Sequence, residues 1–532
     1  QNIMNSQSPT SLHSVPVYKP TPSSSIIEHS VTAQVDIPDD ETYDKAEDQI
    51  DELDQYDGAP HHHLKFKFSW KKLWAFTGPG FLMSIAYLDP GNIASDLQAG
   101  AQTGYKLLWV LLLATILGLC LQLLSARLGI VTGNDLAETC REKYPKPVYL
   151  LLWAAIELAI IASDIQEVIG SAIALNILTF GYLPIWAGVL ITAADTFTFL
   201  FLENYGIRKL EVFFCFLILV MSGTFGYEYY ISKPDQVEVL IGCVYPRISN
   251  QDMPVATAMV GAIVMPHNLY LHSSLVQSRK VDRSHKHRVR DANIYTAIES
   301  SIALGVSFLI NLFVVAVFAA GFHGSKVAKL EDAADALENS YGFAARIIWA
   351  IGLLAAGQSS TMTGTYAGQV VMGGFLQLKI KPWQRVLLTR SLAIVPAVLV
   401  SLLASSDLGR LDNAMNVCQS LLLPFAVLPV LKFTADKNIM GDFANHKIIS
   451  LFVWVVGVLI IVINIYLTLL LLPNANWFGY LSIVFVIYLA FCVYLGVWDY
   501  IRRPILRYWH SNISTEARRK RDEERLIINA DN

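Results

Sequence analysis

The sequence predicts an all-α membrane protein of about twelve transmembrane helices, and three observations carry this prediction. Of the 532 residues, 54% are hydrophobic and only 16% are charged, whereas soluble domains carry about 25% charged residues. The apolar residues occur in blocks of roughly twenty, the length that crosses about 30 Å of hydrocarbon. Only helices and closed barrels span a bilayer, and these blocks are too long for barrel strands of about ten residues.

Twelve such blocks follow one another along the chain. The predicted spans are 74–103, 107–131, 148–179, 183–202, 209–230, 255–278, 293–322, 345–375, 386–404, 413–432, 449–472 and 479–501.

Lysine and arginine gather in alternate loops, which sets the orientation of the spans. The loop between spans 6 and 7, SRKVDRSHKHRVRD, has six basic residues, and further basic residues precede span 1 and follow span 12. The loops after spans 3 and 11 have none. We therefore expect a multi-pass protein with both termini in the cytosol. The pattern fits the plasma membrane and endosomal, phagosomal or lysosomal membranes equally well.

Span 1 is interrupted at mid-depth by Asp89-Pro90-Gly91-Asn92. Proline removes a backbone donor and glycine relaxes the backbone, so we expect the helix to break there. The alternative is an ordinary proline kink, but a kink does not explain why an acid and an amide stand at the break. Polar groups in membrane spans are costly and are functional by default.

Span 6 has a similar interruption, Met265-Pro266-His267-Asn268, which lies 176 residues further along. Interrupted helices in corresponding positions of two halves point to a transporter's binding site. Each motif opens a group of five spans, and five is an odd number, so the second group enters the membrane from the opposite side. The sequence therefore predicts two inverted repeats with helices 1 and 6 broken.

This reading divides the chain into six segments. They are an acidic cytosolic tail (1–64), the first repeat (65–231), an extracytosolic loop (232–254), the second repeat (255–433), spans 11 and 12 (434–502) and a basic cytosolic tail (503–532).

The two breaks together offer an unusual set of metal ligands. Asp89 supplies a carboxylate oxygen, Asn92 an amide oxygen and Met265 a thioether. Soft and hard donors together suit Mn²⁺, Fe²⁺ and Co²⁺ better than Ca²⁺ or Mg²⁺. A methionine is usually a packing residue, but this one stands beside a helix break. In span 10, Asn416 and Gln419 could add oxygens to the metal's shell.

His272 is a candidate proton carrier. It lies two turns, or roughly 10 Å, after Met265, and histidine titrates near neutral pH. The alternative is a neutral, hydrogen-bonded core histidine. We assign His267 a structural role, because it is five residues from His272 and points elsewhere.

Span 3 carries three acids, Glu157, Asp164 and Glu167, spaced so that they share one helix face. Acids inside a span face a cavity or basic partners, so a proton path through them is one interpretation. Arg385 and Arg390 of span 9 are candidate basic partners of the acids in this path. A buried structural ion pair is the alternative. The segment GQSSTMTGTYAGQ of span 8 mainly indicates close packing by small residues, and lining of the cytosolic exit is the alternative.

The remaining features predict little chemistry. Residues 1–64 are polar and acidic, so we expect disorder; they lack the pattern of a signal peptide. The tail ends in three histidines at 61–63, which we interpret as a solvated spacer, with weak metal binding as the alternative. Four of the six cysteines lie in apolar blocks and read as packing residues. We expect no cofactor, no nucleic-acid partner and no enzymatic activity, because no nucleophile–base group or phosphate loop occurs.

The two tetrapeptides and the segment 357–369 resemble the signatures of the Nramp family of proton-coupled divalent-metal transporters, in its eukaryotic form. The resemblance runs from about residue 70 to 433. It implies the LeuT-type fold and metal binding at Asp89, Asn92, Met265 and the Ala262 carbonyl. It implies proton coupling through Asp89, His272 and the span 3 acids. It also implies symport of Fe²⁺ or Mn²⁺, and possibly Co²⁺, Cd²⁺ and Zn²⁺, into the cytosol by alternating access.

Four positions depart from the family pattern. Ala94, Ala320 and Gly373 stand where some relatives carry an acid, and Leu422 stands where glutamine is common. These departures bear on the proton route and not on the metal ligands. A sodium-coupled symporter of the same fold, a sensor and a channel are the alternative functions. We expect a monomer embedded in lipid, with metal ions and protons as its substrates.

Overall fold

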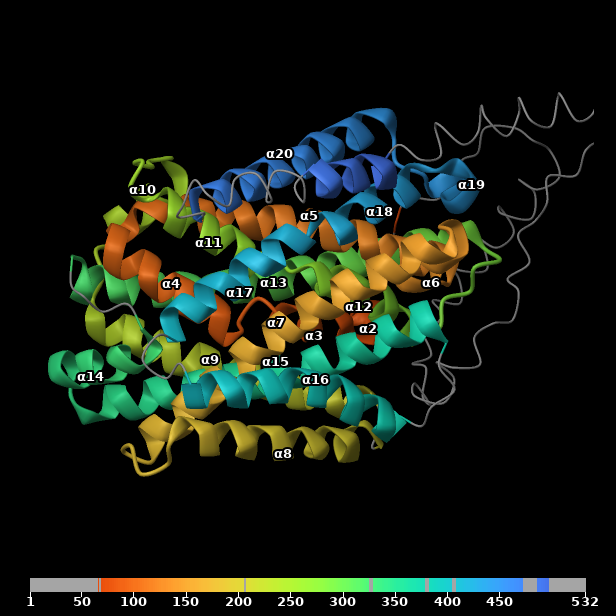
Figure 1. Cartoon of the computed structure of the whole chain (residues 1–532). Helices are drawn as coiled ribbons and strands as arrows, with labels where there is room; N and C mark the ends of the chain where they lie inside the picture. The colour runs from red at the N-terminus through yellow and green to blue at the C-terminus, as the bar shows by residue number, and fades with distance from the viewer. Residues whose placement is uncertain are drawn as a thin grey trace, which may run out of the picture.

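The computed structural model of the chain describes residues 66, 68–204, 207–324, 329–377, 382–403, 408–471 and 486–496. The two predicted tails, including the histidines at 61–63, lie outside the described residues. Within these ranges the structure is helical and contains no strand (Figure 1). Its helices are α2 (Trp70–Phe76), α3 (Pro79–Ile85), α4 (Pro90–Thr103), η1 (Gly104–Leu107), α5 (Leu108–Thr132), α6 (Leu136–Lys143), α7 (Lys146–Leu178), α8 (Ile185–Asn204), α9 (Ile207–Ser232), α10 (Gln236–Val244), α11 (Met253–Ile263), α12 (Pro266–Leu275), η2 (Val276–Ser278), α13 (Lys286–Phe322), α14 (Leu330–Tyr341), α15 (Phe343–Leu376), α16 (Pro382–Leu403), α17 (Leu408–Leu422), α18 (Pro424–Ala435), α19 (Lys437–Met440), η3 (Gly441–Phe443), α20 (Lys447–Leu471) and Val486–Gly496.

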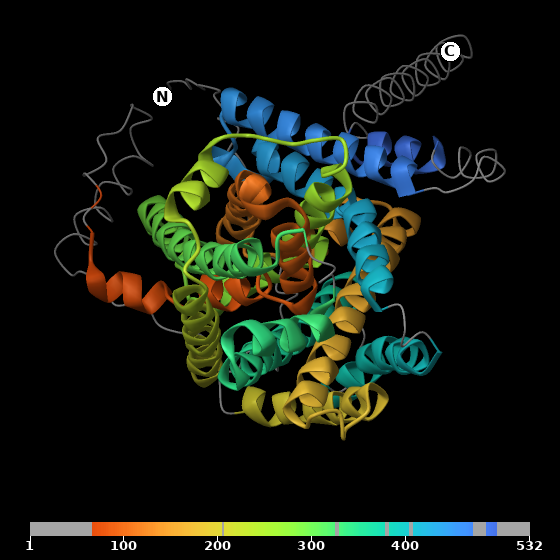
Figure 2. The ribbon, with the colours of Figure 1, turned by 90° about the vertical axis from the view of Figure 1, so that its left-hand side faces the viewer.

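Each predicted span contains a helix or a pair of helices, although span 12 is described only over Val486–Gly496. Seven helical segments of the described chain are long and apolar enough to cross a membrane, and one of them runs from Pro90 through Thr132. The predicted class, an all-α membrane protein, is confirmed, and the total of twelve spans stays a prediction. The end-on view in Figure 2 places the orange helices of spans 1 and 2 in the middle of the bundle.

The predicted breaks in spans 1 and 6 are confirmed. Span 1 consists of α3 and α4, and span 6 consists of α11 and α12. Pro90 and Pro266 are each the first residue of the second helix. A proline fits there because the first helical N–H has no partner within the helix in any case.

Span 10 is one membrane-length segment, Ala414–Ala435, as predicted, but it has a local interruption that the sequence analysis did not name. The structure divides it into α17 and α18 at Leu423. Pro424 is the cause, since it begins α18 and cannot donate to the carbonyl four residues earlier. Several predicted loops also contain helices, among them α6, α10 and α14. The first two are capped by Asp135 and Asp235, whose side chains accept backbone N–H bonds.

Spans 3 and 8 pack closely along their length as α7 and α15. A Cβ atom added at Gly357 would lie 2.1 Å from the Ser171 hydroxyl, and one at Gly364 would lie 2.5 Å from the Asp164 carboxylate. Any larger residue would push the two helices apart. The packing role predicted for the segment 357–369 is therefore confirmed, and it places that segment against the acids of span 3.

Candidate metal site at two helix breaks

The break in span 1 holds polar atoms that other described residues leave without partners. Asp89 is the N-cap of α4, and its Oδ1 accepts the backbone N–H of Asn92 at 2.7 Å. Its second oxygen, Oδ2, and both side-chain atoms of Asn92 have no hydrogen-bond partner among the other described residues. Both residues are only 1% exposed. Buried polar groups are normally satisfied, so these three atoms are available to a ligand.

The break in span 6 adds a carbonyl and a sulfur. Pro266 has no N–H, so it cannot donate to the carbonyl of Ala262 four residues earlier, and that oxygen lacks its helical donor. Met265 is the N-cap of α12, and its side chain is buried. The chain thus presents a carbonyl without its helical donor and a thioether within four residues.

Gln166 of α7 joins these elements. A Cβ atom on Gly91 would lie 3.0 Å from the Gln166 amide, so this side chain lies against the span 1 break. Its Nε2 donates to Asn416 Oδ1 at 3.0 Å, and its Oε1 accepts from Gln419 Nε2 at 2.9 Å. The two polar residues predicted in span 10 therefore lie in one network next to the break.

The second repeat packs around the same place. Helix α11 packs against both α4 and α17. A Cβ atom on Gly261 of α11 would lie 2.1 Å from the hydroxyl of Ser420 and 3.1 Å from the Asn416 carbonyl. The helices that carry Asp89, Ala262 and Asn416 are therefore neighbours. The sequence did not single out Gln166, although a glutamine between two acids in an apolar span was a visible signal.

Two polar residues of α13 hold the backbone of span 1 just before the break. Ser307 donates to the Ser84 carbonyl at 2.8 Å, and the Asn311 amide donates to the Tyr87 carbonyl at 2.8 Å. These bonds replace helical bonds that are lost at the break. The sequence analysis missed both residues. Their spacing of four in an otherwise apolar span could have indicated one polar face.

The candidate proton carriers are all buried. His272 is 0% exposed, and neither of its ring nitrogens has a hydrogen-bond partner in the described structure. Glu157 is also buried, with both carboxylate oxygens lacking such partners. Asp164 interacts electrostatically with Glu157, and Glu167 accepts a hydrogen bond from Ser163 at 2.9 Å. The three acids of span 3 therefore line one side of α7, as predicted from their spacing.

The structure describes only part of two further predictions, the structural role of His267 and the pairing of Arg385 and Arg390 with the span 3 acids. His267 is buried, and its Nδ1 has no hydrogen-bond partner within the described ranges. Arg385 and Arg390 belong to α16, which packs against α7, but their side chains lie outside the described structure. Their pairing with the span 3 acids stays a prediction.

A charged cluster that the sequence analysis missed lies at the start of α3, and we call Glu299, Arg279 and Glu211 the Glu299 cluster. Glu299 of α13 accepts the backbone N–H groups of Gly78 and Gly80, each at 2.9 Å. Arg279, after η2, forms an ion pair with Glu211 of α9 at 2.8 Å. All three side chains are buried. The cluster ties the beginning of span 1 to spans 5, 6 and 7.

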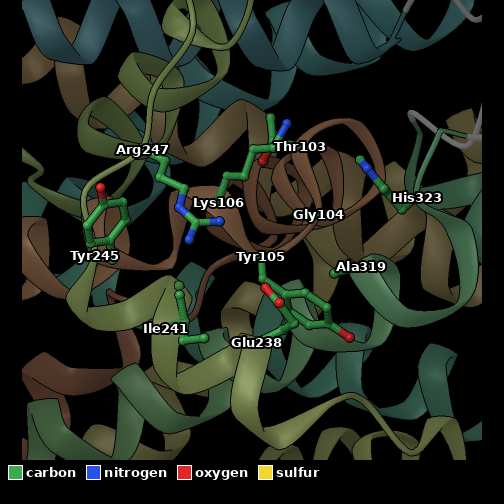
Figure 3. A pocket seen from close by; sticks show the side chains of 11 residues that line it. Thr103, Gly104, Tyr105, Lys106, Glu238, Ile241, Tyr245, Arg247, Ala319 and His323 are labelled. Atoms are coloured by element: carbon green, nitrogen blue, oxygen red, sulfur yellow. The ribbon is translucent and has the colours of Figure 1, made fainter.

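A separate cavity of about 230 Å³ lies at the other end of span 1, between η1, α10 and the end of α13 (Figure 3). Its charged lining consists of Lys106, Arg247 and Glu238, with His323 alongside. Two cations against one carboxylate do not suit a metal cation. This cavity is therefore distinct from the candidate metal site.

The described part of the chain has no group of three or more His, Cys, Asp or Glu side chains arranged to hold a metal ion. The candidate donors are of four different kinds: a carboxylate, an amide, a thioether and a backbone carbonyl. Two broken helices that bring candidate donors to neighbouring positions of a helical membrane fold are typical of the inverted-repeat class of membrane transport folds.

Comparisons with known proteins agree with this class. The chain belongs to the Nramp family: the family model described as natural resistance-associated macrophage protein-like matches residues 80–470. The metal transporter nramp1 homolog of Dictyostelium discoideum is 61% identical over 401 residues, which are 75% of each chain. Metal transporter Nramp3 of Arabidopsis thaliana is 53% identical over 441 residues, covering 80% of this chain and 87% of the relative.

Solved structures support the same fold. A manganese transporter of Eremococcus coleocola, in complex with an aromatic bis-isothiourea substituted compound, superimposes with a TM-score of 0.74 at 31% identity. The match covers 84% of this chain and 97% of that one. Mhp1, a nucleobase-cation-symport-1 family transporter, matches with a TM-score of 0.54 at 15% identity, a likeness in fold alone. The predicted LeuT-type architecture is thereby confirmed.

Proposed function

We propose that this protein moves divalent transition-metal ions, Fe²⁺ or Mn²⁺ foremost, from the outside or an acidic lumen into the cytosol, together with protons. The observation that carries the proposal is the set of buried candidate donors at the two breaks, above all Asp89 Oδ2 and the Asn92 amide. The printed names of the relatives, metal transporters and a manganese transporter, support the same substrate class.

The donor set favours particular metals. A carboxylate and amide and carbonyl oxygens bind many divalent cations, but a thioether adds little for Ca²⁺ or Mg²⁺. Met265 therefore favours Mn²⁺, Fe²⁺, Co²⁺ and heavier ions such as Cd²⁺. The four donors leave room for some of the metal's water, which suits a substrate that must leave again.

Proton coupling follows because the metal and a proton compete for the Asp89 carboxylate. A metal bound to this carboxylate excludes a proton from it, so entry of the cation drives a proton onward. His272 and the span 3 acids Glu157, Asp164 and Glu167 are the acceptors we propose, because they are buried titratable groups within the core of the bundle. Chains of acids and histidines of this kind form proton relays in pumps and transporters.

Alternating access requires that one end of span 1 moves while the other stays packed. The Glu299 cluster supports this step, because it is a discrete set of bonds that holds the beginning of span 1. Arg279 adds a bond to the Thr77 carbonyl at 2.7 Å, so both sides of Gly78 are secured. We propose that these bonds keep the cytosolic end closed while the site faces outward, and that they open together when the metal is released.

The proposal is tested by uptake of radioactive Mn²⁺ into proteoliposomes with an acidic outside solution. We expect Mn²⁺ to accumulate inside above its outside concentration, because an inward proton gradient drives a symporter. Dissipating that gradient with a protonophore should return the inside concentration to equilibrium. Uptake that stops at equal concentrations in both conditions would indicate a channel, and no uptake of any divalent metal would contradict transport.

A further inference from the structure

The cavity between η1, α10 and the end of α13 has a charged lining that the candidate metal site does not use (Figure 3). Lys106 of η1 and Arg247, which follows α10, line it together with Glu238 and His323. All four residues are also exposed to solvent. With the N-terminus in the cytosol, span 1 ends on the extracytosolic side, so the cavity faces that side. Its volume of about 230 Å³ has room for several waters or for one small anion.

Backbone contacts between the three elements hold the walls of this cavity in place. The Gly324 N–H donates to the Ala101 carbonyl at 2.9 Å, which fixes the chain after α13 against the end of α4. A Cβ atom on Gly242 of α10 would lie 2.2 Å from the Tyr105 carbonyl, so α10 packs directly on the backbone of η1. Because main-chain atoms make these contacts, the cavity is part of the fold and does not depend on the rotamers of its lining.

Arg247 is held at the cavity through both its main chain and its side chain. Its carbonyl accepts the Trp109 indole N–H at 3.3 Å. Its guanidinium carbon lies over the Tyr245 ring, 4.8 Å from the ring centroid. An arginine held over an aromatic ring keeps N–H donors for other partners, and its planar fork matches the paired oxygens of a carboxylate or a phosphate. Arg247 is therefore a pre-positioned donor for an oxyanion.

The two cations of the cavity lack an acidic partner. Neither Lys106 nor Arg247 forms an ion pair with an acid of the described chain. Glu238 is the only acid among the described residues that line the cavity, so the two cations exceed the negative charge by one. Single surface cations are usually just solvated, but two cations from separate elements around one hollow concentrate anions there.

Glu238 narrows the kind of anion that the cavity can hold. It lies in the first turn of α10. An ionised carboxylate only accepts hydrogen bonds, so it repels an oxyanion whose oxygens carry no proton. It accepts a hydrogen bond from an anion that also has a hydroxyl group, such as hydrogen phosphate or a hydroxycarboxylate. Two cations and one acceptor therefore favour a ligand with both negative oxygens and a hydroxyl.

We propose that this cavity binds a small oxyanion that also carries a hydroxyl group, through Lys106, Arg247 and Glu238. Lys106 belongs to η1 at the end of span 1, whereas Arg247 belongs to the connection between spans 5 and 6. The bound anion therefore links the end of one broken span to the chain that leads into the other, at a place apart from Asp89 and Met265. Hydrogen phosphate and a hydroxycarboxylate share this chemistry, and binding measurements distinguish them.

The experiment is isothermal titration calorimetry of the purified full-length protein without metal, with inorganic phosphate as the first probe. Lys106→Gln and Arg247→Gln each remove one positive charge from the exposed lining. We expect each change to raise the Kd for phosphate by at least about tenfold, since a hydrogen bond to a charged group contributes that much. Lys233→Gln is the matched control. Lys233 is exposed in the same connection but does not line the cavity, so this variant should keep the Kd of the wild type.

Sulfate tests the role of Glu238, because it matches phosphate in shape but carries no hydroxyl at neutral pH. We expect the wild type to bind phosphate at least about tenfold more tightly than sulfate, since a site built for a hydroxyl rejects the analogue that lacks it. Glu238→Gln should bind both anions with similar Kd values, because an amide can also donate to sulfate. Citrate and tricarballylate, which differ only in the citrate hydroxyl, form a second pair of probes. Tighter binding of citrate than of phosphate would assign the cavity to a hydroxycarboxylate, and the reverse would assign it to a phosphate.

Three results would overturn the proposal. Equal Kd values for the wild type, Lys106→Gln and Arg247→Gln would mean that the two cations are only solvated. Equal binding of phosphate and sulfate by the wild type would mean that the cavity does not recognise a hydroxyl. No binding of either phosphate or citrate would leave the cavity to water. Because no metal is present in these titrations, their outcome is independent of whether the protein transports Mn²⁺.

Discussion

Replacing Asp89 by asparagine should lower Mn²⁺ uptake by at least about 100-fold, which corresponds to ~2.7 kcal/mol. Asp89 is the only carboxylate among the four proposed donors, so the variant loses the one formal negative charge that offsets dehydration of the cation. The change is specific because asparagine also accepts hydrogen bonds at helix N-caps. The bond from the Asn92 N–H, which starts α4, therefore remains. Uptake assays in proteoliposomes with equal amounts of folded protein measure the effect.

Asp235→Asn provides the matched control for this variant. Asp235 is also an aspartate N-cap, and it accepts the Val237 N–H at 2.9 Å at the start of α10. It lies in the connection between spans 5 and 6, away from both breaks. Its replacement should leave uptake within about twofold of the wild type, as surface changes usually do. Comparable uptake by Asp89→Asn and the wild type would remove Asp89 from the metal site.

The second large effect concerns the choice of metal. Met265→Ala should keep part of the Mn²⁺ uptake but let Ca²⁺ compete about tenfold better, a change of ~1.4 kcal/mol. The thioether favours soft ions, and the oxygen donors that remain in the variant bind Ca²⁺ well. The measurement is the Ca²⁺ concentration that halves Mn²⁺ uptake.

Met259→Ala separates loss of the sulfur ligand from loss of packing. Met259 lies on α11, six residues before Met265, and is fully buried, with 0% exposure. Met259→Ala removes the same kind of side chain at a position away from the break. The variant therefore has a cavity similar to that of Met265→Ala but keeps its metal ligands. If both variants changed Ca²⁺ competition equally, or if Met265→Ala still excluded Ca²⁺, the thioether would not be the source of selectivity.

The break motifs were predictable because proline and glycine act locally. Pro90 and Pro266 each remove a backbone donor wherever the rest of the chain lies, so the positions of both breaks follow from the sequence. The two candidate donors Asp89 and Asn92 follow in the same way, since they are within three residues of each other. The local interruption inside span 10 was not predicted, although Pro424 has the same local effect.

The long-range partners could not be predicted, because one sequence does not specify which helices become neighbours. Gln166 looked like one more polar residue of span 3 until its bonds to Asn416 and Gln419 placed it at the site. Glu299 looked like a lone acid of span 7, yet it caps α3, which is more than 200 residues away in the chain. Such contacts depend on tertiary packing, for which spacing along one helix gives no signal.

The most direct test of the central claim, proton-coupled metal transport, is to record Mn²⁺ entry and internal pH in the same proteoliposomes. With metal on the outside and no preset pH gradient, the account predicts that the vesicle interior acidifies as Mn²⁺ enters. Both signals should be lost in Asp89→Asn. Mn²⁺ entry without any acidification would contradict proton coupling and would leave His272 and the span 3 acids as structural groups.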